Sequence, residues 1–120
     1  MSQRDLKGAL LAALLAVACG GAAVPSQKMI NAQVAIRGAE GAGAEQNPKA
    51  ALHLKMARDQ VAKAERFVED GENERAALVL DQAQADADMA YALSHEDQMR
   101  RQAEQARQRV EELRSQAQAK

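Results

Sequence analysis

The sequence has little of what most folds and most enzymes rely on: one cysteine, no tryptophan, one tyrosine, one phenylalanine and two prolines among 120 residues. A single cysteine has no partner for a disulfide within the chain. Positive and negative charges are interleaved and nearly cancel, with a formal net charge of -1. Nucleic-acid binding, which needs a basic face, is therefore not expected.

Catalytic groups are also scarce. A hydrolase or transferase needs a nucleophile with a base in reach, or paired carboxylates in a cleft. The serines lie in the N-terminal segment, at a predicted helix start and in charged helical segments, and the carboxylates alternate with arginine and lysine. The sequence therefore predicts neither a catalytic site nor a cofactor, and it favours a structural or adaptor role.

What the chain does have is alanine, a strong helix former. Between residues 47 and 94, apolar residues recur every three or four positions in two runs, one on each side of Gly71. This spacing puts each run on one face of a helix. The runs are Leu54, Ala57, Val61, Ala64 and Val68, and then Ala76, Leu80, Ala83, Ala87 and Ala90. We predict an all-α protein built on an antiparallel helical hairpin.

Both predicted helices have start and stop signals. Asn47 can cap free backbone N–H groups, and Pro48 tolerates the first helical position. Gly71 accepts the left-handed conformation that ends a helix, and Asn73 is expected to cap the second helix. Alanine buries little area, so we expect the larger residues to carry most of the stability. These are Leu52, Leu54, Met56, Val61, Phe67, Val68, Leu78, Val79, Leu80 and Met89.

Residues 1–18 have the pattern of an export signal. Arg4 and Lys7 precede an apolar run over residues 8–18, which is shorter than the roughly 20 residues of a transmembrane helix. The run stops at Cys19, and residues 15–19 resemble the lipobox of bacterial lipoproteins, in which the cysteine is diacylated and becomes the mature N-terminus. This resemblance makes Cys19 the predicted lipidation site. The alternative is an ordinary secretory signal or an uncut membrane anchor.

Residues 19–25 are small and flexible, as a tether between a lipid and a fold needs to be. Bulky residues at partly helical spacing then predict a short helix over residues 26–37, capped by Ser26 and packed on the hairpin. The glycines of residues 38–43 are expected to break this helix. The predicted domain, residues 26–94, is thus a helical hairpin with a short preceding helix.

The end of the chain is predicted to continue the second hairpin helix. No glycine or proline occurs from residue 72 to residue 120, so residues 74–118 would span about 67 Å of helix. Residues 95–120 form a charged extension with a narrow apolar stripe, typical of a coiled coil. Val110 and Leu113 are its predicted partner-binding residues, for another helical protein or for self-association. The alternative is a solvated helix held by pairs of Glu and Arg.

The two histidines suggest a second function. A hairpin that turns near residue 72 would place His53 opposite Tyr91 at the open end of the hairpin, with His95 and Glu96 close by. Zinc sites usually take three or four ligands, so no metal site is predicted. The alternative function is a small cell-envelope binding module that uses this open end for a cell-wall fragment or a metal.

One pattern covers the whole hairpin: a proline start, spaced leucine and alanine, a central glycine, and then alanine, leucine and an Asp-Ala pair. Its residues are Pro48, Leu54, Ala57, Ala64, Gly71, Ala76, Leu80, Ala83, Asp86, Ala87 and Ala90. With Cys19, this pattern resembles a family of uncharacterised bacterial lipoproteins that have an alanine-rich helical hairpin and often precede an OmpA-like domain. The resemblance implies a lipid-anchored protein of the cell envelope that faces the periplasm, with no established activity.

The resemblance also bears on location and partners. Gly20 stands where inner-membrane lipoproteins of enteric bacteria carry a retention aspartate, which favours the outer membrane. No OmpA-like domain follows within residues 95–120, so a wall-binding domain is not expected. Lys120 at the end of a long helix resembles the major enterobacterial outer-membrane lipoprotein, which is joined to peptidoglycan through a C-terminal lysine. The membrane and peptidoglycan are therefore candidate partners beside a helical protein.

Overall fold

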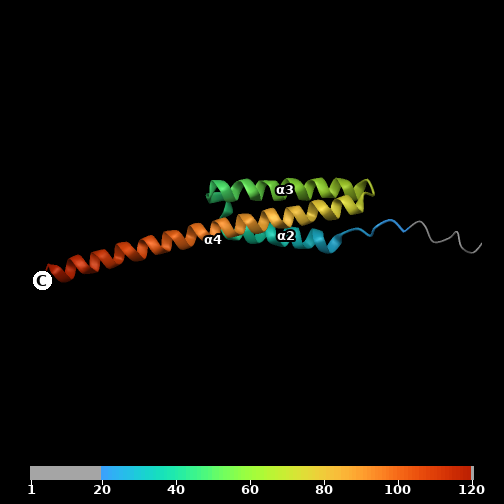
Figure 1. Ribbon diagram of the computed structural model, residues 1–120. Helices are drawn as coiled ribbons and strands as arrows, with labels where there is room; N and C mark the ends of the chain where they lie inside the picture. The colour runs from blue at the N-terminus through green and yellow to red at the C-terminus, as the bar shows by residue number, and fades with distance from the viewer. Residues whose placement is uncertain (1–19, 120) are drawn as a thin grey trace, which may run out of the picture.

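The computed structural model describes residues 20–119, and its regular structure over that range is entirely helical (Figure 1). The all-α prediction is confirmed. α3 and α4 run antiparallel as a hairpin, and α2 lies along α4 and parallel to it. The elements in chain order are α2 (Ser26–Gly41), the 3-10 helix η1 (Ala44–Gln46), α3 (Pro48–Glu69) and α4 (Asn73–Gln118).

The interface between α3 and α4 is the alanine seam that the spacing predicted. All five predicted residues of α4 are buried, and in α3 only Val68, near the turn, is partly exposed. Seven of the ten buried apolar residues of α3 and α4 are alanine, and such small side chains allow the helix axes to approach to the close end of the usual ~8–10 Å range. On α4 the seam continues one turn further, to Ser94, whose hydroxyl donates to the carbonyl of Ala90 at 2.8 Å.

Several of the larger apolar residues lie outside the core, contrary to prediction. Leu54 and Leu80 are fully buried, whereas Leu52 and Leu78 are 58% and 66% exposed. Each exposed leucine comes two positions before a buried one, and two positions turn an α-helix by about 200°. The side chains of Leu52 and Leu78 therefore point away from the seam. The helix face on which a residue lies, and not the size of its side chain, decides whether it is buried. The exposed residues of the predicted set are Leu52, Met56, Leu78 and Met89.

The turn between α3 and α4 ends α3 in the way that a C-terminal glycine predicts. Gly71 adopts a positive φ of 77°. The N–H of Glu72 donates to the carbonyl of Phe67 at 2.7 Å, and the N–H of Gly71 donates to that of Val68 at 3.0 Å. This pair of bonds is the Schellman motif, which satisfies carbonyls that the last helical turn leaves free.

The predicted cap of α3 is confirmed. Asn47 has an extended backbone, and its side-chain Oδ1 accepts from the N–H groups of Lys49 at 3.0 Å and Ala50 at 3.2 Å. Pro48 follows Asn47 directly and has no N–H, so the Asn47 side chain accepts from the first two backbone N–H groups that the helix offers. Asn47 thus fixes where α3 begins and where the loop from α2 ends.

The predicted caps of the other two helices are wrong. Pro25 precedes α2, and Ser26 is already helical and makes no side-chain cap. Asn73 is likewise the first residue of α4, because the Schellman turn is so short that Glu72 occupies the capping position. The amide of Asn73 donates instead to the carbonyl of Ala22 at 2.7 Å, which holds the segment before α2 against the hairpin turn.

α2 is longer than predicted, because it continues through Gly38 to Gly41. A glycine inside a helix costs about 1 kcal/mol relative to alanine, and tertiary contacts can offset this. In α2 the last turn buries Ala39 completely, and Glu40 forms an ion pair with Arg58 of α3 at 2.6 Å. The break comes at Gly43, which has a positive φ of 78° and leads into η1.

Polar contacts hold α2 and η1 on the hairpin, as predicted for a short helix packed against it. Lys28 of α2 pairs with Asp81 of α4 at 2.5 Å. The guanidinium of Arg58 contacts the carboxylates of Glu45 at 2.8 Å and Glu40 at 2.6 Å, and the two carboxylates raise its pKa above the ordinary value. The buried side chains of α2 are Ala32, Ile36 and Ala39.

Candidate functional site

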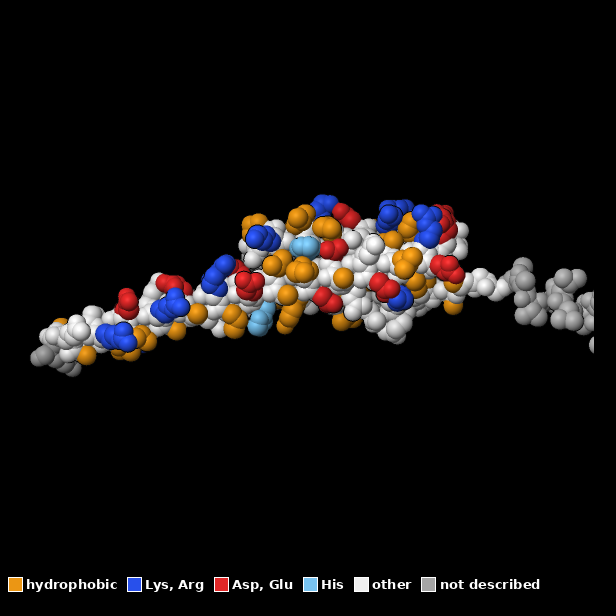
Figure 2. Space-filling model, viewed as in Figure 1, with side chains coloured by type: hydrophobic (Ala, Val, Ile, Leu, Met, Phe, Trp, Pro, Cys, Tyr) orange, Lys and Arg blue, Asp and Glu red, His pale blue; other side chains and the backbone are white. Residues whose placement is uncertain are grey.

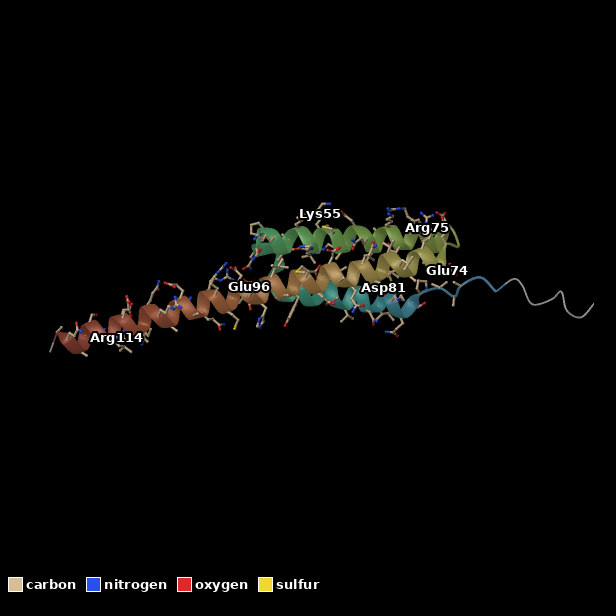
Figure 3. All side chains as sticks on the ribbon, viewed as in Figure 1. Lys55, Glu74, Arg75, Asp81, Glu96 and Arg114 are labelled. Atoms are coloured by element: carbon tan, nitrogen blue, oxygen red, sulfur yellow. The ribbon has the colours of Figure 1, made fainter. Side chains whose placement is uncertain are left out.

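α4 continues far beyond the helices that cover it. Within the described residues, its last side-chain hydrogen bond to the rest of the bundle comes from Gln98, whose amide donates to the carbonyl of Ala42 at 2.9 Å. Every residue from 99 to 119 is exposed. We call residues 99–118 the overhang; at 1.5 Å per residue they extend about 30 Å. Figure 3 labels Glu96 where α4 leaves the bundle and Arg114 near its end.

The overhang displays the apolar stripe that the spacing predicted. Met99, Val110 and Leu113 are 44%, 47% and 54% exposed, so no other part of residues 20–119 covers the predicted partner residues. Figure 2 shows apolar groups along one edge of the overhang, with charged groups beside them. The full stripe is Met99, Ala103, Ala106, Val110, Leu113 and Ala117.

The open end of the hairpin does not assemble the group predicted there. Tyr91 and His95 stack on each other, with ring centroids 6.2 Å apart and planes at 24°, and both are exposed. They directly follow the buried residues Ala90 and Ser94, and one position turns the helix by about 100°, which carries both rings out of the seam. His53 does not join them.

A hollow of about 360 Å³ with a mixed polar and apolar lining does lie at this open end, between the start of α3 and the part of α4 where the bundle stops. Neither Tyr91 nor His95 lines it. Of the four residues predicted for the open end, Glu96 lines the hollow and the other three do not. Its lining residues are Gln46, Asn47, Pro48, Lys49, Leu93, Glu96, Asp97 and Arg100.

His53 turns instead to Asp86, which bridges α3 and α4. One carboxylate oxygen of Asp86 lies 2.8 Å from Nδ1 of His53, and the other accepts from the amide of Gln60 at 2.8 Å. An ionised carboxylate only accepts, so the facing nitrogen of His53 carries the proton. The helical spacing did not predict this bridge. The sequence feature that pointed to it was the Asp-Ala pair of the hairpin pattern, in which Asp86 is the acidic residue.

Removing the bridge should weaken the hairpin measurably. Asp86→Ala leaves two partly buried donors, on His53 and Gln60, without their acceptor, so we expect a loss of about 1–3 kcal/mol in the free energy of unfolding. Asp88→Ala, an exposed carboxylate two positions on, should change stability by less than about 0.5 kcal/mol. Urea unfolding followed by circular dichroism measures both. Equal losses in the two variants would show that the bridge contributes nothing specific.

An apolar hollow lies at the opposite end of the bundle, near the segment that leads to the N-terminus. Its volume is about 440 Å³, and its floor consists of side chains from the start of α2, the end of α3 and the residues just before α2. Ser26, Glu65 and Glu69 also line it. The apolar and proline residues of the floor are Val24, Pro25, Met29, Ile30 and Val68.

Two predicted sites fall outside the part of the chain that the structure describes. Cys19 and the signal segment 1–18 precede residue 20, and Lys120 follows residue 119. Within residues 20–119, no three His, Asp or Glu side chains converge as metal ligands would. Over the same residues, no helix has both the length and the apolar character needed to span a bilayer.

Fold and surface together define a small all-α protein, in which three helices form a bundle and the end of the longest, α4, projects from it uncovered. Residues 27–106 match a family described as a domain of unknown function (DUF4398). The chain belongs to this family, since the match covers the bundle and the first part of the overhang. Val110 and Leu113 lie beyond the matched residues. No curated protein and no solved structure matches the chain.

Proposed function

We propose that this protein is a lipid-anchored component of the cell envelope that faces the periplasm, attached through Cys19 and serving as a structural or adaptor protein. It acts through helix–helix contacts made by the overhang. The family match carries no activity with it, so the proposal depends on the sequence of the first 19 residues and on the shape of the described chain. The outer membrane is the favoured location, because Gly20 follows the anchoring residue.

The observation that carries the proposal is the placement of the two ends. The described chain starts at one end of the bundle, where residues 20–25 lead into α2, and the overhang projects from the other end (Figure 1). α4 has 46 residues and is therefore about 69 Å long. A lipid at Cys19 would hold the molecule at one end and leave the stripe of the overhang at the far end, free to bind a partner.

The proposal includes no catalytic step, and four polar side chains of the described residues are already engaged in contacts within the chain. Ser94 and Ser115 donate to backbone carbonyls of their own helix, at 2.8 Å each. The carboxylates of Asp59 and Asp81 pair with lysines at 2.5 Å. Each of these four groups is thus engaged in a contact within one helix or between two helices.

Labelling with a fatty-acid analogue tests the anchor. We expect the wild-type protein to be labelled and to sediment with membranes, because two or more acyl chains, at about 0.8 kcal/mol per buried CH₂, hold a protein that one chain does not. Cys19→Ser should be unlabelled and released. A matched control is Cys19→Ser combined with Ser26→Cys, which keeps a thiol in the chain but moves it away from the signal. Labelling of Cys19→Ser would rule the anchor out.

A further inference from the structure

The overhang has an unequal distribution of charge around its apolar stripe. In heptad terms, Ala103, Val110 and Ala117 occupy a positions, and Met99, Ala106 and Leu113 occupy d positions. The e positions, which flank the stripe on one edge, are all arginine. These residues are Arg100, Arg107 and Arg114. The opposite edge, at the g positions, is formed by Gln102, Arg109 and Gln116.

We call Arg100, Arg107 and Arg114 the arginine edge. They are seven residues apart, so they lie in one row along the stripe. Within the described residues, the ion pairs of the overhang involve Arg100 and Arg101, both with Asp97, which lies at the base of the overhang. Arg107 and Arg114 form no such pair there. The three glutamates of the overhang, Glu104, Glu111 and Glu112, lie outside the e and g positions.

This arrangement disfavours pairing with a second copy of the chain. In a parallel pair, each g residue faces the next e residue of the partner, which sets Arg109 against Arg114 and Gln102 against Arg107. In an antiparallel pair, the arginine edges face each other. Neither orientation brings an acidic side chain to an edge, and like charges in these positions select against a partner.

We propose that the overhang docks a helix of another protein, one that has an apolar stripe flanked by Glu or Asp. The inference depends on the proposed adaptor role and specifies the partner's chemistry. Acidic flanks would meet the arginine edge and Arg109, while small residues at Ala103, Ala106 and Ala117 allow close approach. Partner choice in such pairs is set at the e and g positions.

An anionic lipid surface fits the overhang less well. Interfacial helices have a wide apolar face, often with aromatic residues, and a strongly basic polar face. The overhang has three bulky apolar residues in twenty positions, no aromatic residue, and three glutamates against five arginines. It also lies at the end of the bundle remote from residue 20. A narrow seam with one basic edge is the surface that an acidic amphipathic helix complements.

Two synthetic helices test this proposal. Both have the same Leu and Ala seam over roughly three heptads, with Glu at every e and g position in one and Lys in the other. Fluorescence anisotropy measures their binding to the full chain in a mild non-ionic detergent. We expect the Glu peptide to bind at least about tenfold more tightly than the Lys peptide, and salt raised from about 50 to about 500 mM to reduce the difference.

Variants separate charge from apolar contact. Arg107→Glu with Arg114→Glu should abolish the preference, because two glutamates then offset Arg100 and Arg109 at the e and g positions. Leu113→Asp should abolish binding of both peptides. All three positions are exposed, so the bundle stays folded. Equal binding of the two peptides to the wild-type chain, or an unchanged preference in the double variant, would overturn the proposal. So would a dimer of the wild-type chain that survives the double variant in sedimentation, or binding to phosphatidylglycerol vesicles without binding to the Glu peptide. None of these outcomes affects labelling at Cys19, so the anchor is decided separately.

Discussion

Leu80→Asp is expected to unfold the bundle, whereas Leu78→Asp, the same substitution two positions earlier in α4, is expected to leave it folded. Leu80 is 0% exposed, and it and Leu54 are the largest fully buried side chains. An unpaired carboxylate in that seam costs several kcal/mol, which is comparable to the whole ~5–15 kcal/mol stability of a small domain. The side chain of Leu78 already lies in solvent, so a carboxylate there stays hydrated.

Thermal unfolding followed by circular dichroism distinguishes the two variants. Leu78→Asp should melt within a few degrees of the wild type, since surface substitutions change stability by about 0.5 kcal/mol or less. Leu80→Asp should show no cooperative transition of the bundle. Coincident melting curves would mean that the two leucines share one environment, contrary to the burial in the structure.

Gln105→Pro is expected to remove the helix of the overhang without unfolding the bundle. Proline inside a helix removes one backbone hydrogen bond and clashes with the preceding turn, at a cost of about 3 kcal/mol or more. Residues 106–118 would then be left as a separate segment near the ~12–15 residue limit below which isolated helices are barely stable in water. All of these residues are exposed, so no tertiary contact with the rest of the described chain compensates.

Helical content and bundle stability should therefore respond separately. The circular dichroism signal at 25 °C should fall in Gln105→Pro, while the midpoint of the cooperative melt stays at its wild-type value. Gln105→Ala, which keeps the helix, serves as the control and should leave both unchanged. A lowered midpoint in the proline variant would show that the overhang stabilises the bundle through contacts that the structure does not contain.

Local patterns predicted much of the fold. The three-four spacing identified the seam, the caps at Asn47 and Gly71 identified the ends of α3, and the lack of Gly and Pro after residue 72 identified the length of α4. These features depend on helix geometry and on backbone conformations that few residues tolerate, and both are visible in sequence. The exposed stripe followed from the same periodicity, because its phase differs from that of the seam.

What the sequence did not predict depends on contacts between elements. α2 extends through Gly38 because Ala39 packs into the bundle and Glu40 meets Arg58 of another helix. A hairpin that turns near residue 72 was predicted to place His53 opposite Tyr91, but His53 pairs with Asp86. The rotation of each helix about its own axis decides which side chains meet, and counting residues from the turn does not give that rotation. The arginine edge was present in the sequence as a heptad pattern, but only the structure shows that Arg107 and Arg114 form no ion pair within the described residues and that the overhang is uncovered.

The route of the chain through the bundle determines how the molecule bears tension. α2 and α4 are parallel and start at the same end, and a pull that separates Gly20 from Gln118 draws them in opposite directions along their shared axis. That load is a shear between the two helices. All buried contacts of α2 with α4 are loaded at the same time, so they must break together and not one after another. Forced separation is set by the rate of unfolding. The bundle is thus built to resist stretching between its two ends better than it resists peeling of α3 from the side.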